Sequence, residues 1–109
     1  MSEVFKNAKL ILTESMEVLY LSPPNTTSMI LSIFAVNTSD NSINIEVYWC
    51  DYSDNNNETY LCKTSLQGGE TKLIIGGDMK FVLESNDSIK AKSDSNSFVH
   101  LTLSALEMS

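Results

Sequence analysis

The side chains that could perform chemistry are few and widely separated. His100 is the single histidine among 109 residues. It has no second histidine to share a metal and no evident orienting carboxylate nearby in the sequence, so it makes a poor base or ligand. The many serines come without a Gly-x-Ser-x-Gly elbow. The sequence therefore predicts no catalytic residue and no enzyme, with His100 at a surface or an interface.

Two cysteines flank the acidic segment 51–58. If that hairpin is symmetric about Asn56, Cys50 and Cys62 lie directly opposite each other, both on the sheet face away from Trp49, and a cross-strand disulfide is conceivable. A reducing compartment instead predicts two free thiols. The chain lacks a Cys-x-x-Cys motif and further ligands at zinc spacing, which disfavours redox exchange and a metal site.

The segment between the cysteines has three possible roles. Asp51, Asp54, Asn56 and Glu58 could offer oxygens to calcium, although the order and the glycine of an EF-hand are missing. The same residues also suit a solvated hairpin tip, or a contact loop to a neighbouring subunit.

Two glycine pairs are predicted to form tight turns. Neither Gly68-Gly69 nor Gly76-Gly77 is followed by Lys-Ser/Thr or by a helix, both of which a phosphate cradle requires. Glycine supplies the positive φ of a hairpin turn at little cost. No cofactor site is expected.

The elements that carry these residues alternate in polarity with a period of two. From Val99 to Ala105 the odd positions are apolar, and from His100 to Ser104 the even positions are polar, which predicts a strand with one buried face. Residues 43–49 alternate in the same way, with 59–66 as the partner strand. Residues 28–36 are apolar on both faces, which predicts a central strand that is covered on both sides or lies at a subunit contact.

Turn signals separate these segments every 8–12 residues, and residues 22–26 form a stiff loop because proline cannot donate to a strand ladder. The pattern predicts an all-β fold: a single antiparallel β-sandwich, Ig-like or jelly-roll-like, of about eight or nine short strands. Residues 4–12 could alternatively form a helix. We expect one domain over residues 1–109, with the N-terminal strands in 1–22 available for intersubunit contacts.

The composition disfavours some classes of binding partner. The net charge of −7 disfavours nucleic acids and anionic membrane surfaces, while it suits docking on a basic neighbour. No stretch approaches the length of a membrane span, and residues 1–6 do not resemble a secretion signal. Without secretion, the four glycosylation sequons, at Asn25, Asn37, Asn57 and Asn86, carry no meaning.

Several local patterns look like those of a known family. They are Ala35-Val36-Asn37-Thr38 at the end of the central strand, Val47-Tyr48-Trp49, Gly68-Gly69 before Lys72-Leu73-Ile74-Ile75, Phe81-Val82-Leu83-Glu84 leading into Asp87-Ser88-Ile89-Lys90-Ala91, and a last strand closing on Leu106-Glu107. This succession, over roughly residues 28–107, resembles small Ig-like β-sandwich virion proteins of tailed bacteriophages. One departure is Asn86-Asp87, where that family often has Gly-Asp.

The resemblance implies a non-enzymatic structural protein in many copies, which decorates the capsid, sits in the head–tail connector or belongs to the tail. Its partners would be copies of itself, as a homo-oligomer, and larger capsid, portal or tail proteins. It would be located in the virion after assembly in the bacterial cytoplasm.

Two other classes of function compete with this one. A carbohydrate-binding or adhesin module would use exposed Tyr48, Tyr52 and Tyr60, and a small hydrolase would depend on Asp51 or His100.

Overall fold

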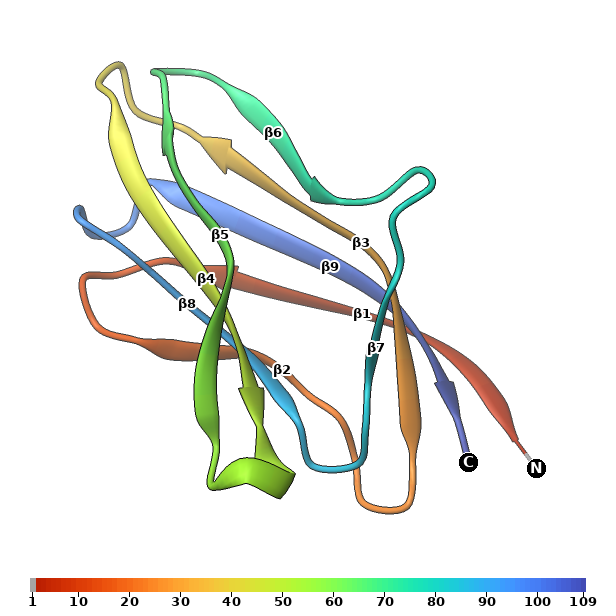
Figure 1. The fold of residues 1–109 in the computed structure, drawn as a ribbon. Helices are drawn as coiled ribbons and strands as arrows, with labels where there is room; N and C mark the ends of the chain where they lie inside the picture. The colour runs from red at the N-terminus through yellow and green to blue at the C-terminus, as the bar shows by residue number, and fades with distance from the viewer. Residues whose placement is uncertain (1) are drawn as a thin grey trace.

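The computed structural model describes residues 2–109, so residue 1 of the expected domain lies outside the described residues. It contains one 3-10 turn and nine strands, which confirms the all-β prediction (Figure 1). The strands are β1 (Glu3–Ile11), β2 (Glu17–Leu21), β3 (Thr27–Asn37), β4 (Ile43–Asp51), β5 (Asn57–Leu66), β6 (Thr71–Ile75), β7 (Phe81–Leu83), β8 (Ser88–Ser93) and β9 (Val99–Met108), and the 3-10 turn η1 (Tyr52–Asp54) links β4 to β5. The alternative helix over residues 4–12 is wrong, because residues 4–11 lie in β1 and residue 12 follows its end. Within residues 2–109, no helix has the length and hydropathy that crossing a membrane requires.

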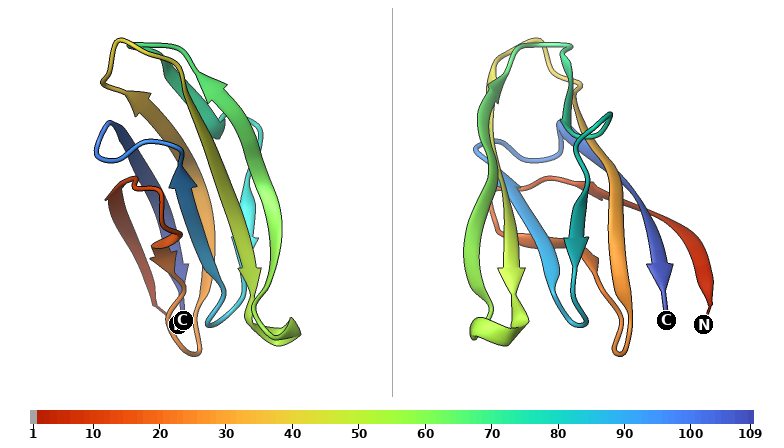
Figure 2. Two further views of the ribbon diagram at one scale, coloured as in Figure 1. Left: turned by 90° about the vertical axis from the view of Figure 1, so that its left-hand side faces the viewer. Right: turned by 45° about the vertical axis from the view of Figure 1, so that its right-hand side comes forward.

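The strands form two antiparallel sheets packed face to face (Figure 2). The five-stranded sheet has the order β1-β9-β3-β6, and β7 also pairs with β3. The four-stranded sheet has the order β2-β8-β4-β5. Strand β3 is therefore central, as the sequence predicted: β9 lies along one side of it, while β6 and β7 share the other side.

Alternating side chains of both sheets fill the space between them. From β9 the odd residues Val99 to Ala105 are buried, as the sequence predicted. From β4 Ile43, Ile45 and Val47 are buried, and Trp49 packs against the same core with its ring edge toward Phe81, 5.6 Å between centroids. Burying each large aliphatic side chain contributes about 1.5–3 kcal/mol, so these two strands anchor the core.

Hydrogen bonds of the Asn37 side chain hold together the strands at one end of the sandwich. Its side chain is fully buried, and its Nδ2 donates to the carbonyl oxygens of Asn41, Leu66 and Gln67 at 2.7, 3.1 and 3.1 Å. Its Oδ1 accepts hydrogen bonds from the Ser39 backbone N–H and hydroxyl. One amide thus joins the end of β3 to the β3–β4 turn and to the end of β5. A residue this deeply buried also cannot serve as a glycosylation site.

Asp87 fastens the opposite end. Its buried carboxylate accepts hydrogen bonds from Trp49 Nε1 at 3.2 Å, from the Tyr52 backbone N–H at 2.9 Å and from the Glu84 backbone N–H at 3.1 Å. It thereby ties the β7–β8 turn to β4 and to η1. The positive φ of 69° at Asn86 lets the chain make this turn without the glycine of the resembled family.

Candidate interaction surfaces

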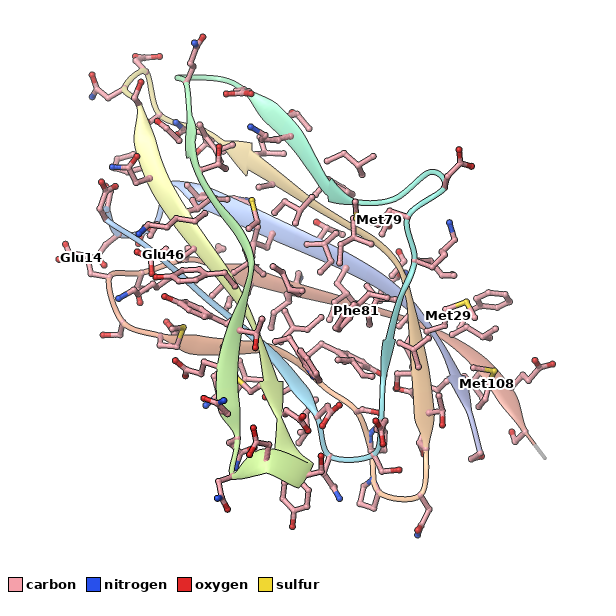
Figure 3. All side chains as sticks on the ribbon, in the orientation of Figure 1. Glu14, Met29, Glu46, Met79, Phe81 and Met108 are labelled. Atoms are coloured by element: carbon pink, nitrogen blue, oxygen red, sulfur yellow. The ribbon has the colours of Figure 1, made fainter. Side chains whose placement is uncertain are left out.

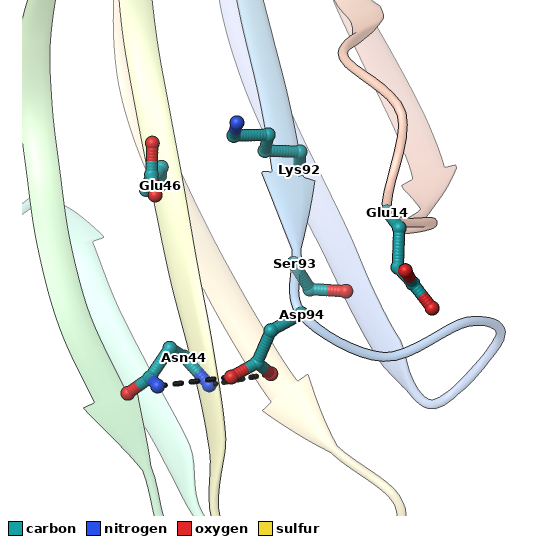
Figure 4. A pocket seen from close by; sticks show the side chains of 6 residues that line it. All are labelled: Glu14, Asn44, Glu46, Lys92, Ser93 and Asp94. Carbon is teal, nitrogen blue, oxygen red and sulfur yellow. Dashed lines mark hydrogen bonds between the residues drawn. The ribbon is translucent and has the colours of Figure 1, made fainter.

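A shallow polar hollow lies on the outer side of the four-stranded sheet (Figure 4). Its volume is about 260 Å³, and its lining residues are Glu14, Asn44, Glu46, Lys92, Ser93 and Asp94. The backbone N–H and the Nδ2 of Asn44 donate to the two carboxylate oxygens of Asp94 at 3.0 and 2.9 Å. Both Asp94 oxygens already accept hydrogen bonds from Asn44. The polar groups of the hollow therefore stabilise the local turn and are not arranged as a reaction site.

An aromatic and charged cluster covers the middle of the same outer face. Tyr48 and Tyr60 stack with ring centroids 4.5 Å apart, and the Nζ of Lys63 lies 5.3 Å from the centroid of Tyr60. The Tyr48 hydroxyl donates to the Glu46 carboxylate, and this bond, with Lys92 and Lys63 nearby, lowers the pKa of Glu46. The same bond raises the pKa of Tyr48.

The expectation of an exposed Tyr48 is wrong. Its side chain faces the outer side, as the alternation predicted, but only 8% of it is exposed. Tyr52, on η1, and Tyr60 are about half exposed. The three-tyrosine platform of the carbohydrate-binding alternative therefore lacks one of its members.

The two cysteines are free and do not face each other. The β4–β5 hairpin is not symmetric about Asn56: Cys50 lies opposite Glu58, and Cys62 lies opposite Val47. Leu61 is an extra residue in β5, so the register shifts there and Cys62 turns inward against the core. Cys50 alternates with Trp49 and lies on the outer side. The prediction that both thiols share the face opposite Trp49 is thus wrong for Cys62, and the prediction of free thiols is confirmed.

The acidic segment 51–58 is a hairpin tip with internal hydrogen bonds. Asp51 Oδ1 accepts from the Ser53 backbone N–H and hydroxyl, and the Nδ2 of Asn57 donates to Asp54 Oδ2 at 3.3 Å. Asn55 and Asn56 have positive φ values of 57° and 58°. Among residues 2–109, no group of three or more His, Cys, Asp or Glu side chains converges as a metal site would require. The contact-loop interpretation of this tip stays a prediction.

A buried hydroxyl network lies between β2 and β3. The hydroxyls of Tyr20 and Ser28 are 2.9 Å apart, and those of Ser28 and Ser22 are 2.8 Å apart. The Tyr20 hydroxyl also donates to Glu107 Oε2. Burial, together with this bond to Glu107, raises the pKa of Tyr20 to about 12. Sequence reasoning missed this cluster, because no motif links the hydroxyls of residues 20–28 to the distant carboxylate of Glu107.

A further candidate surface is the outer face of the five-stranded sheet. Register places Phe5, Leu106, Met29 and Val82 side by side across four strands. Two or more rows away, Ile11 lies beside His100 and Val36, and Phe34 lies beside Leu73. We call this surface the apolar face; its members are Phe5, Ile11, Met29, Phe34, Val36, Leu73, Val82 and Leu106.

The members of the apolar face project away from the core. Met29 and Met108 point to the opposite side of the sheet from the core residue Phe81 (Figure 3). Phe5 is 74% exposed and Leu73 is 59% exposed. The middle of the face is polar, where the Ser104 hydroxyl donates to Asn7 Oδ1 at 2.9 Å.

His100 is exposed on this face, between Ile11 and Val36. The two-sided apolar character of residues 28–36 is the sequence signal for this surface, and the structure resolves it: one side of β3 is in the core, and the other lies on the apolar face.

No family model matches the chain, and no curated protein sequence matches it. Several solved structures share the fold. A chain from the capsid structure of Helicobacter pylori bacteriophage KHP30 matches with a TM-score of 0.58 and 11% identity, over 98% of this chain and 87% of that one. A chain from Bacillus endospore appendages, described as disulfide-linked pili, matches with a TM-score of 0.56 and 8% identity, over 99% and 87%.

A chain of the T13 viral particle of infectious bursal disease virus matches with a TM-score of 0.52 and 6% identity. The match covers 97% of this chain but only 31% of the viral one. At these identities the likeness shows the fold alone. The chain thus shares a β-sandwich architecture with viral capsid and pilus proteins.

Proposed function

We propose that this chain is a non-enzymatic structural protein of a tailed-bacteriophage virion, present in many copies and decorating or joining larger capsid or tail components. The observation that carries the proposal is the apolar face. Its exposed apolar side chains lie at both ends of the sheet face, on either side of the polar middle, and covering such side chains with a partner is favourable.

The size of the apolar face supports a protein partner. With strands about 4.8 Å apart and a rise of about 3.3 Å per residue, the whole outer face of this sheet, its polar middle included, projects to roughly 600 Å². A stable interface buries about 800 Å² of accessible surface on each partner, and a corrugated sheet exposes more area than its projection. The outer face of the sheet, with the apolar face at its two ends, is therefore about the size of one standard protein interface.

The shared architecture with capsid and pilus chains agrees with this role. Oligomeric assembly components in that set also agree with self-association. In this proposal the apolar face rests on a larger virion protein, and the acidic hairpin tip 51–58 and the aromatic cluster around Tyr48 stay accessible.

The test begins with purified virions of the phage whose genome encodes the chain. Mass spectrometry should detect the chain in stoichiometric, multi-copy amounts, and its absence from the particles would refute the proposal.

A binding assay then tests the surface, using purified protein and particles that lack it. Val82 and Val18 are each 50% exposed, but Val82 lies on the apolar face and Val18 on the other sheet. Val82→Asp should abolish binding and Val18→Asp should preserve it. Equal binding by both variants would show that the apolar face is not part of the contact with the particle.

A further inference from the structure

The free edges of the two sheets differ in a way that points to a partner strand. A free edge exposes unpaired N–H and C=O groups, and proteins that must stay unpaired shorten such strands or insert bulges. Three edge strands carry an extra residue that breaks their register: Leu19 in β2, Leu61 in β5 and Ile74 in β6. A fourth, β7, has three residues.

Strand β1 has none of these protections. It spans nine residues and pairs with β9 in unbroken register from Glu3 to Ile11. Figure 2 (left) shows it at the margin of the sheet, beside β9. Apolar Val4, Phe5 and Ile11 are exposed along it, so the edge combines free backbone with side chains that gain from burial. Among the edge strands of residues 2–109, β1 is therefore the one that presents a long, regular row of unpaired backbone groups.

The hydrogen-bond pattern shows which residues of β1 face outward from the sheet edge. Ser2 and Ser109 exchange both backbone bonds, at 2.8 and 2.9 Å, and the Leu12 N–H donates to the Val99 carbonyl at 2.8 Å. Even-numbered residues thus bond to β9, and the N–H and C=O groups of the odd-numbered residues from 3 to 11 point away from it.

We infer that β1 pairs antiparallel with β1 of a second copy of this chain, about a two-fold axis at Asn7, to form one continuous sheet. This inference rests on the proposed function, since it names one partner that a multi-copy subunit meets. In this register Phe5 lies opposite Lys9 of the other copy, Val4 opposite Leu10 and Asn7 opposite Asn7. The odd-numbered residues then make about ten backbone hydrogen bonds across the new junction.

Side-chain chemistry selects this register over its neighbours. A lysine beside an aromatic ring is attractive, and an apolar pair buries surface. Moving the axis by one residue toward the start of the strand places Lys6 directly opposite Lys6, which is repulsive. Moving it by one residue the other way leaves Glu3 and Val4 without opposite residues. The axis at Asn7 uses the whole strand and opposes no like charges, which is the self-complementarity that a two-fold contact requires.

The first test is the mass of the wild-type chain in solution, measured by sedimentation over a range of concentrations, where a dimer is expected. Asn7→Pro removes an N–H that points away from β9, and proline is tolerated at such edge positions. By symmetry two hydrogen bonds are lost, so the dimer dissociation constant should rise roughly 30-fold. Asn7→Ala keeps the N–H and should remain dimeric. Thermal melts check that both variants fold.

The second test reads the register directly. Opposed residues in a hydrogen-bonded antiparallel pair have Cα atoms about 5.5 Å apart, within disulfide range. Asn7→Cys should therefore form a disulfide-linked dimer on mild oxidation. Lys9→Cys should not, because its counterpart would lie roughly 14 Å away along the strands. The wild-type chain, whose thiols are on the other sheet, is the baseline.

A monomeric wild-type chain, a dimer dissociation constant that Asn7→Pro leaves unchanged, or equal cross-linking through positions 7 and 9 would each overturn the pairing. These results are independent of the virion test. A chain found in particles but monomeric in solution refutes the pairing alone, and a dimer absent from particles refutes the proposed function alone.

Discussion

Asn37→Asp is a sharp test of how the β3 end of the sandwich is held. The change is nearly isosteric, but it replaces the two N–H donors with a carboxylate oxygen that faces three backbone carbonyl oxygens at 2.7–3.1 Å. A buried carboxylate without donors is strongly disfavoured, so the new side chain becomes protonated instead.

The free-energy cost of that protonation determines how much unfolding free energy the variant loses. An ordinary Asp has a pKa of about 3.9, so keeping it protonated at pH 7 costs about 4 kcal/mol, and the neutral acid has one O–H donor where the amide has two N–H donors. The variant should lose about 4–5 kcal/mol of unfolding free energy at pH 7. At pH 5 protonation costs only about 1.5 kcal/mol, so the loss should shrink to about 2–3 kcal/mol.

The linkage between proton binding and folding determines the direction in which the stability of Asn37→Asp changes with pH. The pKa of the introduced carboxyl group would be higher in the folded variant than in the unfolded chain, so the folded state binds more protons and gains stability as the pH falls. Urea unfolding followed by the fluorescence of Trp49, the single tryptophan, measures both values. The exposed change Asn41→Asp is the control and should stay within about 0.5 kcal/mol of wild type. A loss for Asn37→Asp below about 1 kcal/mol, or one equal at pH 5 and pH 7, contradicts the reasoning.

Three further predictions concern other contacts. Asp87→Ala leaves three donors unpaired and should cost about 3 kcal/mol of unfolding free energy, against less than about 1 kcal/mol for the exposed Asp94→Ala; similar melting temperatures for the two variants would contradict this. Because the pKa of Tyr20 is raised to about 12, its stabilising contribution is complete below pH 10 and is lost as the pH rises through 12; Tyr20→Phe should therefore flatten the alkaline part of the stability curve, and unchanged curvature would count against the network. A Cβ on Gly68 would lie 2.5 Å from the Asp40 backbone, whereas one on Gly76 would meet only the Leu73 side-chain tip, so Gly68→Ala should lower the melting temperature more than Gly76→Ala does.

Local patterning predicted the strands well, because burial on one face imposes a period of two. β9 shows this most clearly, since its alternating residues from Val99 to Ala105 are all buried. A different signal, the apolar character of residues 28–36 on both faces, predicted that β3 lies in the middle of its sheet. Turn chemistry was also readable: Gly69 and Gly77 have positive φ values of 76° and 61°.

What the sequence could not predict depends on contacts between distant segments. The extra residue Leu61 moves Cys62 to the inner side, and nothing local distinguishes it from its neighbours. Tyr48 has the polarity of an exposed position but is covered by a ring from the next strand. Asn37 reads as an ordinary turn residue, and its role emerges only when the end of β5 arrives beside it. Bulges and side-chain networks of this kind arise from tertiary packing.

The position of β9 has a consequence for how the molecule is made. This strand lies between β1 and β3, and it joins residues 3–11 to residues 100–108. While a ribosome is still translating the intervening residues, β9 is absent, so β1 and β3 cannot join one sheet and their apolar side chains remain exposed to water. Loops of this length close slowly. The nascent chain should therefore stay unfolded and sensitive to proteases until residues 99–108 emerge, and then acquire its structure in a single late step.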